Sequence, residues 1–297
     1  MSTANLIRLL LLCLIWGTSF MLLRIASPIF GPMLTTFGRA FLGALSLYAF
    51  ARHMGIRFEW RKNAKTYLII GLTNTAIPFS LFAWSALHIP SAYMATMNSL
   101  TAIFTAVFGF LLMGDRLSML RISAFLLGLG GVAILVGIGP ITVTPLVIGG
   151  VLAGMAGAMN YGYAAIYTRM HAKEIPSVAT AAGSQFAAAL VLLPFALPAL
   201  PHAIEFGTSS AVVAVLILGV VCTGIAYALF FHLISTEGAS KAVTVTFLVP
   251  ATASIWAWLL LDEPITVGIV TGIAIVLLAT AMSLGLFKRQ SSLKVSN

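Results

Sequence analysis

Two long stretches of the chain contain no Asp, Glu, Lys or Arg, and they constrain the fold more than any other feature. Residues 66–114 form a stretch of 49 residues, and residues 122–168 form another of 47. A helix needs about 20 predominantly apolar residues to cross a bilayer, so each stretch suits two crossings joined by a turn. The turn residues are present as His88-Ile89-Pro90-Ser91 in the first stretch and Gly139-Pro140 in the second. We therefore predict an all-α integral membrane protein.

The composition agrees with this class and excludes others. Hydrophobic residues make up 60% of the chain and charged residues 8%, whereas soluble domains carry about 25% charged residues. The net charge of +9 does not indicate nucleic-acid binding, because the basic residues separate apolar runs. Cys13 and Cys222 lie inside apolar segments, which argues against a disulfide framework or a metal site. With no nucleotide-binding motif either, we expect no cofactor.

Dividing the apolar runs at turns and charges gives ten predicted transmembrane helices. They cover residues 6–26, 33–52, 66–87, 92–113, 118–138, 145–170, 177–197, 209–235, 241–261 and 265–287. With a cytoplasmic N-terminus, 14 of the 16 basic residues fall in cytoplasmic segments, as the positive-inside rule requires. These are Arg8, Arg52, Arg57, Arg61, Lys62, Lys65, Arg116, Arg121, Arg169, Lys173, Lys241, Lys288, Arg289 and Lys294. We predict that both termini are cytoplasmic.

The second half of the sequence repeats the first at a nearly constant spacing. Trp16-Gly17 and Arg24 match Tyr161-Gly162 and Arg169 at 145 residues, while Leu81-Phe82 match Leu229-Phe230, and Asp115 matches Glu263, at 148. We predict two five-helix repeats, residues 1–140 and 141–297. Because five is an odd number, the second repeat is inverted in the membrane. Inverted repeats place a substrate site near the midplane between the halves and permit alternating access.

At these residues the chain resembles the EamA-type family of the drug/metabolite transporter superfamily. The resemblance rests on the Trp-Gly-Thr-Ser-Phe stretch at 16–20 with Arg24 behind it, on Arg39 followed by Phe41-Leu42, and on the acidic residues that close spans 4 and 9. It covers nearly the whole chain and implies a carrier in the bacterial inner membrane. Length and aromatic content are most similar to those of family members that export aromatic amino acids. One departure is Ala102, where the second half has Pro250 and the family often has proline.

The predicted substrate site consists of polar and aromatic side chains at mid-membrane depth. Asn, Thr and Tyr could hydrogen-bond the ammonium and carboxylate of an amino acid, and aromatic rings could hold an apolar side chain or a cation. The alternative for any single aromatic residue is contact with lipid or packing in the interior. The candidate substrate-binding residues are Trp16, Arg39, Asn74, Pro78, Phe82, Asn98, Thr101, Asn160, Tyr163, Tyr227, Phe231, His232 and Thr246.

Two of these candidates have specific roles to test. Arg39 could anchor a substrate carboxylate, or it could bind helix-end carbonyls or extend toward the interface. His232 could couple transport to protons, or it could hydrogen-bond between helices as a neutral imidazole. Among the remaining charges, we expect Arg24 to extend to the membrane surface and Asp115 and Glu263 to cap the helices that follow them.

The predicted function is a secondary carrier that exports small metabolites, with hydrophobic or aromatic amino acids as the favoured substrates. An exporter of cationic drugs or other metabolites is the alternative. All acidic residues fall in loops or at span ends, which disfavours pumps with an intramembrane glutamate and membrane-embedded enzymes. The expected partners are the lipid bilayer and a small-molecule substrate, and a monomer suffices because the repeat is internal. Spans 118–138 and 265–287 lack strongly polar residues at mid-depth, so we expect each to lie at the periphery and to pack on its own half.

Overall fold

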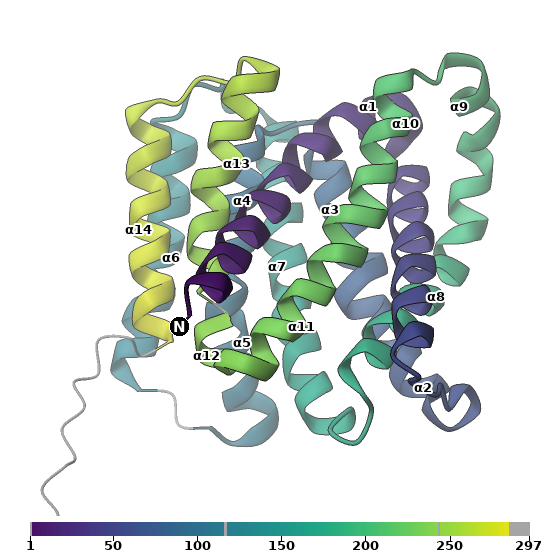
Figure 1. The fold of residues 1–297 in the computed structure, drawn as a ribbon. Helices are drawn as coiled ribbons and strands as arrows, with labels where there is room; N and C mark the ends of the chain where they lie inside the picture. Colours follow the sequence, from purple (N-terminus) through teal and green to yellow (C-terminus); the bar gives the residue numbers. More distant parts are fainter. Residues whose placement is uncertain (1, 116–117, 243, 285–297) are drawn as a thin grey trace, which may run out of the picture.

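The described part of the chain is an all-helical bundle (Figure 1). The computed structural model describes residues 2–115, 118–242 and 244–284, and no strand occurs among them. Seven helices are long and apolar enough to cross a membrane, and two shorter apolar helices accompany them. These observations confirm the all-α class. Four of the basic residues used for the orientation, Arg116, Lys288, Arg289 and Lys294, lie outside the described residues, as do the last residues of the predicted span 265–287.

The helices follow one another with short connections. In chain order they are α1 (Thr3–His53), α2 (Trp60–Gly71), α3 (Ile77–Ser85), α4 (Ser91–Ser99), α5 (Thr101–Met113), α6 (Met119–Gly137), α7 (Pro145–His171), α8 (Ser177–Ala196), α9 (Leu200–Phe206), α10 (Ser209–Leu216), α11 (Ala226–Glu237), α12 (Ala239–Ala242), α13 (Val245–Leu261) and α14 (Val267–Ser283). Two π-helical segments, η1 (Leu72–Ala76) and η3 (Ile217–Ile225), join α2 to α3 and α10 to α11, and a 3-10 turn, η2 (Leu197–Ala199), joins α8 to α9.

Helix α1 folds back on itself. It contains 51 residues, and a straight helix of that length would measure about 76 Å, more than twice the ~30 Å hydrocarbon thickness of a bilayer. Gly31 breaks it with φ 73° and ψ 158°, a conformation that favours glycine, and Pro28 and Pro32 flank the break. The first leg of α1 rises from the N-terminus and the second leg descends toward α2 (Figure 1). The break falls between the predicted spans 6–26 and 33–52.

The two π-helical segments occupy equivalent positions in the two halves. Shifting η1 by the repeat spacing of 148 residues places it inside η3. In η1 the cause is local, because the ring nitrogen of Pro78 cannot donate to the carbonyl of Asn74 four residues earlier. Such wide turns occur often at functional sites. Asn74 lies in η1 and Thr223 in η3.

Helices α6 and α14 pack against each other more extensively than any other pair of elements in the described residues. Glycines allow the close approach: a Cβ on Gly131 would lie 2.8 Å from Val276 Cγ2, and one on Gly272 would lie 2.7 Å from Leu135 Cβ. The prediction that these two spans each pack on their own half is therefore wrong. Their small-residue stripes face each other across the two halves.

The bundle has two distinct ends (Figure 1). The N-terminus, α2 and α12 lie at one end, here called the lower end, and α9 and the loop between α13 and α14 lie at the upper end. The described basic residues Arg52, Arg169 and Lys241 belong to segments that end at the lower end.

Candidate functional site

Both halves of the chain line one central cavity of about 460 Å³. This volume falls within the range of small-molecule sites, about 300 to 1,000 Å³. Eight of the thirteen candidate residues line it: Trp16, Arg39, Asn74, Phe82, Asn98, Thr101, Tyr227 and Thr246. They come from α1, η1, α3, α4, α5, α11 and α13, so the cavity is built from segments far apart in the sequence.

Four other candidates contact protein outside this cavity. Pro78 is buried at the start of α3 and shapes η1 instead. Asn160 donates from Nδ2 to the carbonyl of Ala156 at 2.9 Å, within its own helix. The ring of Tyr163 makes a T-shaped contact with the ring of Phe108, with 5.6 Å between the ring centroids. Phe231 lines a second, neighbouring cavity.

His232 lies outside both cavities. Its side chain is exposed near the lower end of α11, and its carbonyl accepts from the hydroxyls of Ser235 and Thr236 at 2.9 and 2.8 Å. The structure therefore does not place this imidazole where it would meet a substrate in the central cavity.

Several cavity residues were not among the candidates, and the internal repeat contained the signal for them. At the repeat spacings, Tyr161 is the equivalent of Trp16, Phe230 of Phe82, and Phe79 of Tyr227. All six rings line the cavity. Asn98 and Thr246 form a further equivalent pair in the lining. A residue chosen in one half thus predicts a lining residue in the other.

The aromatic residues form much of the cavity wall. Trp16 lies 5.2 Å from Phe230 between ring centroids and 6.4 Å from Tyr227. Phe82 stacks on Tyr161 with 6.0 Å between centroids. The indole nitrogen of Trp16 donates to the carbonyl of Cys222 at 3.2 Å, so its polar edge is satisfied within the protein. The rings therefore offer apolar faces suited to an apolar or aromatic ligand.

Arg39 is the one charged residue among the described residues of the cavity lining. It is 9% exposed, and its Cζ lies 3.9 Å from the centroid of the Phe79 ring. Its Nε donates to Thr223 Oγ1 at 3.3 Å, which uses one of the five N–H groups of a guanidinium. The cavity therefore holds a fixed positive charge, and no described lining residue is acidic.

A second cavity of about 330 Å³ adjoins the first. The two share Asn74, Ala165 and Tyr227 in their linings. From there the second cavity reaches Ile175 in the connection between α7 and α8 and Ser177 at the start of α8, at the lower end of the bundle. The structure thus provides a route from the central cavity toward the lower end.

The charged residues near the helix ends differ from their predicted roles. Arg24 does not extend to the surface: its Nε lies 2.8 Å from Glu263 Oε1, because a carboxylate from the second half is within reach. Glu263 does not cap the helix after it, since Thr266 caps α14 and Glu263 accepts from the backbone of Ser91 at 2.9 Å. Asp115 likewise pairs with Arg169 of α7 across the halves, and the N-cap residue of α6 is Ser118, whose side chain makes no capping hydrogen bond.

Comparisons with known proteins identify the family. The EamA-like transporter family model matches residues 4–137 and 148–285. The chain is 24% identical over 281 residues to the uncharacterized transporter YoaV of Bacillus subtilis (strain 168), covering 93% of this chain and 95% of the relative. It is 22% identical over 286 residues to a probable terminal-alkyne amino-acid exporter of Streptantibioticus cattleyicolor, covering 93% of each.

A solved crystal structure has the same fold, with a TM-score of 0.64 at 19% identity, over 98% of this chain and 100% of that chain. At this identity the likeness concerns the fold alone. The family match extends over nearly the whole chain, and the relatives are named as transporters. The chain belongs to the EamA-like transporter family.

Proposed function

We propose that the protein is a secondary carrier that exports hydrophobic and aromatic amino acids from bacterial cells. The observation that carries this proposal is the position of Arg39, a buried cation within an aromatic cavity that has no described acidic residue in its lining. A buried charge is costly unless it is paired. A substrate carboxylate would pair with the guanidinium, and the aromatic walls would receive the side chain.

Alternating access is the proposed transport mechanism. With the two legs of α1 counted separately, the seven long helices and the two shorter ones give ten crossings. The family model matches one stretch in each half, in keeping with two five-helix repeats. Because equivalent residues of the repeats line one cavity, a rearrangement of one half against the other would expose that cavity to either side in turn.

The orientation and the export direction are part of the same proposal. The basic residues Arg52, Arg169 and Lys241 lie in segments that end at the lower end, which we assign to the cytoplasm by the positive-inside rule. Both termini are then cytoplasmic, and the protein resides in the inner membrane as a monomer with one substrate route. The relative named as an amino-acid exporter supports this substrate class.

Export of cationic drugs is the second candidate, and the aromatic walls alone would suit it. Arg39 disfavours it, because the guanidinium in the cavity lining would repel a cationic ligand. The carboxylate is therefore the group that separates the two functions. Tryptamine and phenethylamine resemble tryptophan and phenylalanine but lack it.

The test is release of labelled compounds from preloaded liposomes that contain the purified protein. With no ion gradient imposed, we expect release of phenylalanine and tryptophan and retention of tryptamine and phenethylamine. Release of the amines alone would favour the cation exporter. Release of amino acids only under a pH gradient would replace uncoupled transport with proton coupling, and no release across an amino-acid panel would remove the substrate proposal.

A further inference from the structure

We propose that Arg24, Glu263, Arg169 and Asp115 form two equivalent gates, one at each end of the central cavity, with the upper gate closed and the lower gate open in this structure. The proposal rests on the proposed alternating-access function and assigns these residues a role outside the substrate site. Their equivalence follows from the sequence, since Arg24 and Arg169 are 145 residues apart and Asp115 and Glu263 are 148 apart. Each gate thus pairs an arginine of one repeat with a carboxylate of the other.

In the upper gate, the ion pair binds the turn between α3 and α4. Arg24 Nε lies 2.8 Å from Glu263 Oε1. Arg24 Nη1 also donates to the carbonyls of Ile89 at 2.9 Å and Ala86 at 3.3 Å. Glu263 accepts from the backbone N–H of Ser91 at 2.9 Å and from its hydroxyl at 3.2 Å. One set of contacts therefore joins the first leg of α1, the α13–α14 connection and the α3–α4 turn.

The charges match the helix ends that they meet. The guanidinium contacts the carbonyl of Ala86, the residue that ends α3, and the carboxylate contacts the N–H of Ser91, where α4 begins. These are the backbone groups that a helix leaves unpaired, and their partial charges are opposite to those of Arg24 and Glu263. With only 32% and 12% of the two side chains exposed, water screens these contacts less than those of a surface ion pair.

The lower gate has the equivalent arginine–carboxylate pair, but this pair is not bound to a helix turn in the contacts of the described residues. Arg169 Nη1 lies 3.9 Å from Asp115 Oδ2, and the two side chains are 60% and 42% exposed. The repeat spacing of 148 makes the α11–α12 turn, at residues 237–239, the equivalent of the α3–α4 turn. Two equivalent ion pairs therefore differ in separation and in exposure, as expected if one gate is closed and the other is open.

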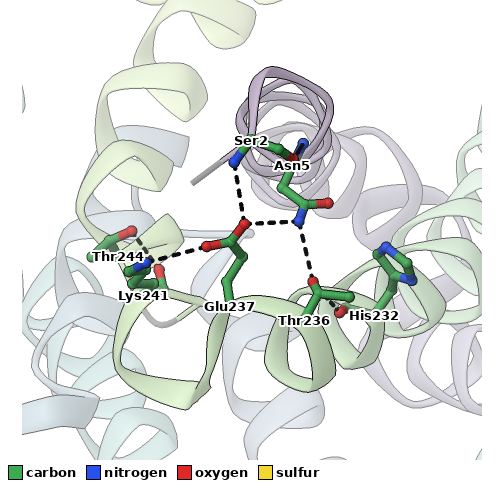
Figure 2. A network of polar contacts seen from close by, with 7 residues as sticks. All are labelled: Ser2, Asn5, His232, Thr236, Glu237, Lys241 and Thr244. Carbon is green, nitrogen blue, oxygen red and sulfur yellow. Dashed lines mark hydrogen bonds and ion pairs between the residues drawn. The ribbon is translucent and has the colours of Figure 1, made fainter.

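Figure 2 shows that the N-terminal end of α1 contacts the α11–α12 turn. Glu237 Oε1 accepts from Asn5 Nδ2 at 2.8 Å and from the backbone N–H of Ser2 at 3.3 Å. Glu237 Oε2 accepts from Lys241 at 3.2 Å. In this state the turn is thus held by the first leg of α1 and by α12.

The cavities agree with this assignment. The central cavity adjoins a second one that reaches the α7–α8 connection at the lower end, next to the segment that carries Arg169. In the opposite state, Arg169 and Asp115 would bind the α11–α12 turn, and Arg24 and Glu263 would release the α3–α4 turn. The two gates would then close in alternation.

A cysteine placed in the cavity reports which side is open. Ala102 lines the cavity, and the native Cys13 and Cys222 are only 1% and 0% exposed, so Ala102→Cys gives a low-background reporter. A membrane-impermeant maleimide is added to the outer face of spheroplasts, and the labelling rate is measured. Glu263→Gln removes the charge of the upper gate, and Asp115→Asn is its matched counterpart at the lower gate.

We expect Glu263→Gln to raise the outer labelling rate roughly tenfold or more, since a hydrogen bond to a charged group contributes at least that factor. Asp115→Asn should lower the rate or leave it unchanged, because it weakens the outward-open state. Ser91→Ala, which removes only the hydroxyl contact to Glu263, should give a smaller rise and serves if Glu263→Gln does not fold.

Equal effects of the two charge-removing variants, or no effect of either, would overturn the gates. Because labelling requires no substrate, this outcome would be independent of the amino-acid efflux test. If the labelling shifts in opposite directions but no amino acid is transported, the gates stand and the substrate proposal fails.

Discussion

Replacing Arg39 with glutamine removes the charge that we assign to substrate recognition. The side chain is 9% exposed, lies over Phe79 at 3.9 Å and donates to Thr223, so the change is confined to the cavity wall. A hydrogen bond to a charged group contributes about 1.5 to 3 kcal/mol. Since about 1.4 kcal/mol corresponds to a factor of ten, Arg39→Gln should weaken phenylalanine binding by about 10- to 150-fold.

The stability of the variant separates binding from folding. An arginine at mid-membrane depth costs about 2.5 to 3.5 kcal/mol on insertion scales. In return, the cation–π contact with Phe79 contributes about 0.5 to 2 kcal/mol, and the hydrogen bond from the guanidinium to Thr223 contributes about 1.5 to 3 kcal/mol. Because these effects oppose each other, we expect the melting temperature of the detergent-solubilised variant to stay close to that of the parent while its affinity falls.

The assay is equilibrium binding of labelled phenylalanine to the purified protein, with a thermal melt of the same sample. Arg52→Gln is the matched control, because it removes an equal charge from an exposed position at the end of α1, outside the cavity. Phenylalanine affinity within twofold of the parent in Arg39→Gln, or an equal loss in Arg52→Gln, would refute the carboxylate-anchor reasoning.

Two further predictions concern packing and proton coupling. Gly162→Ala places a Cβ 2.8 Å from the backbone carbonyl carbon of Phe104. This overpacking should destabilise the protein by about 1 to 3 kcal/mol and lower its melting temperature. Gly130→Ala is the control and should leave the melting temperature unchanged, because a Cβ there would have no atom within 4 Å. Equal melting temperatures for the two glycine variants would contradict this packing. His232→Gln should leave phenylalanine efflux and its pH dependence unchanged, because the imidazole is exposed and lies outside the cavities. A lost pH response in that variant would instead make His232 a coupling residue.

The sequence predicts the helical segments well because hydropathy and turn residues are local signals. The break of α1 at Gly31, between two prolines, separates the predicted spans 6–26 and 33–52. The partner of each helix is not a local property. Glycine stripes on α6 and α14 indicate close packing, but nothing in either stripe tells whether it faces its own half or the other.

The sequence predicts cavity-lining residues best where a candidate lies in a segment that the two repeats share. Trp16 and Phe82 belong to the matched segments, and their equivalents Tyr161 and Phe230 also line the cavity. Helical spacing alone does not tell which face of α7 lines the cavity. Tyr163 therefore was a reasonable candidate, although its ring packs against Phe108 of α5.

The charges near the helix ends show a different limit. Arg24 and Glu263 are far apart in the sequence, so their separate positions suggest a surface residue and a helix cap. Only the fold brings their side chains to 2.8 Å. The sequence did pair each of them with an equivalent in the other half, and that pairing allows the two gates to be compared.

The central claim is that one cavity binds an amino acid and opens to each side in turn. Counterflow measures this directly: liposomes containing the protein are loaded with excess unlabelled phenylalanine, diluted, and given a trace of labelled phenylalanine outside. Alternating access predicts that the label inside rises transiently above its equilibrium level, and that Arg39→Gln diminishes this overshoot. Entry of label to equilibrium without an overshoot, or no entry at all, would contradict the account.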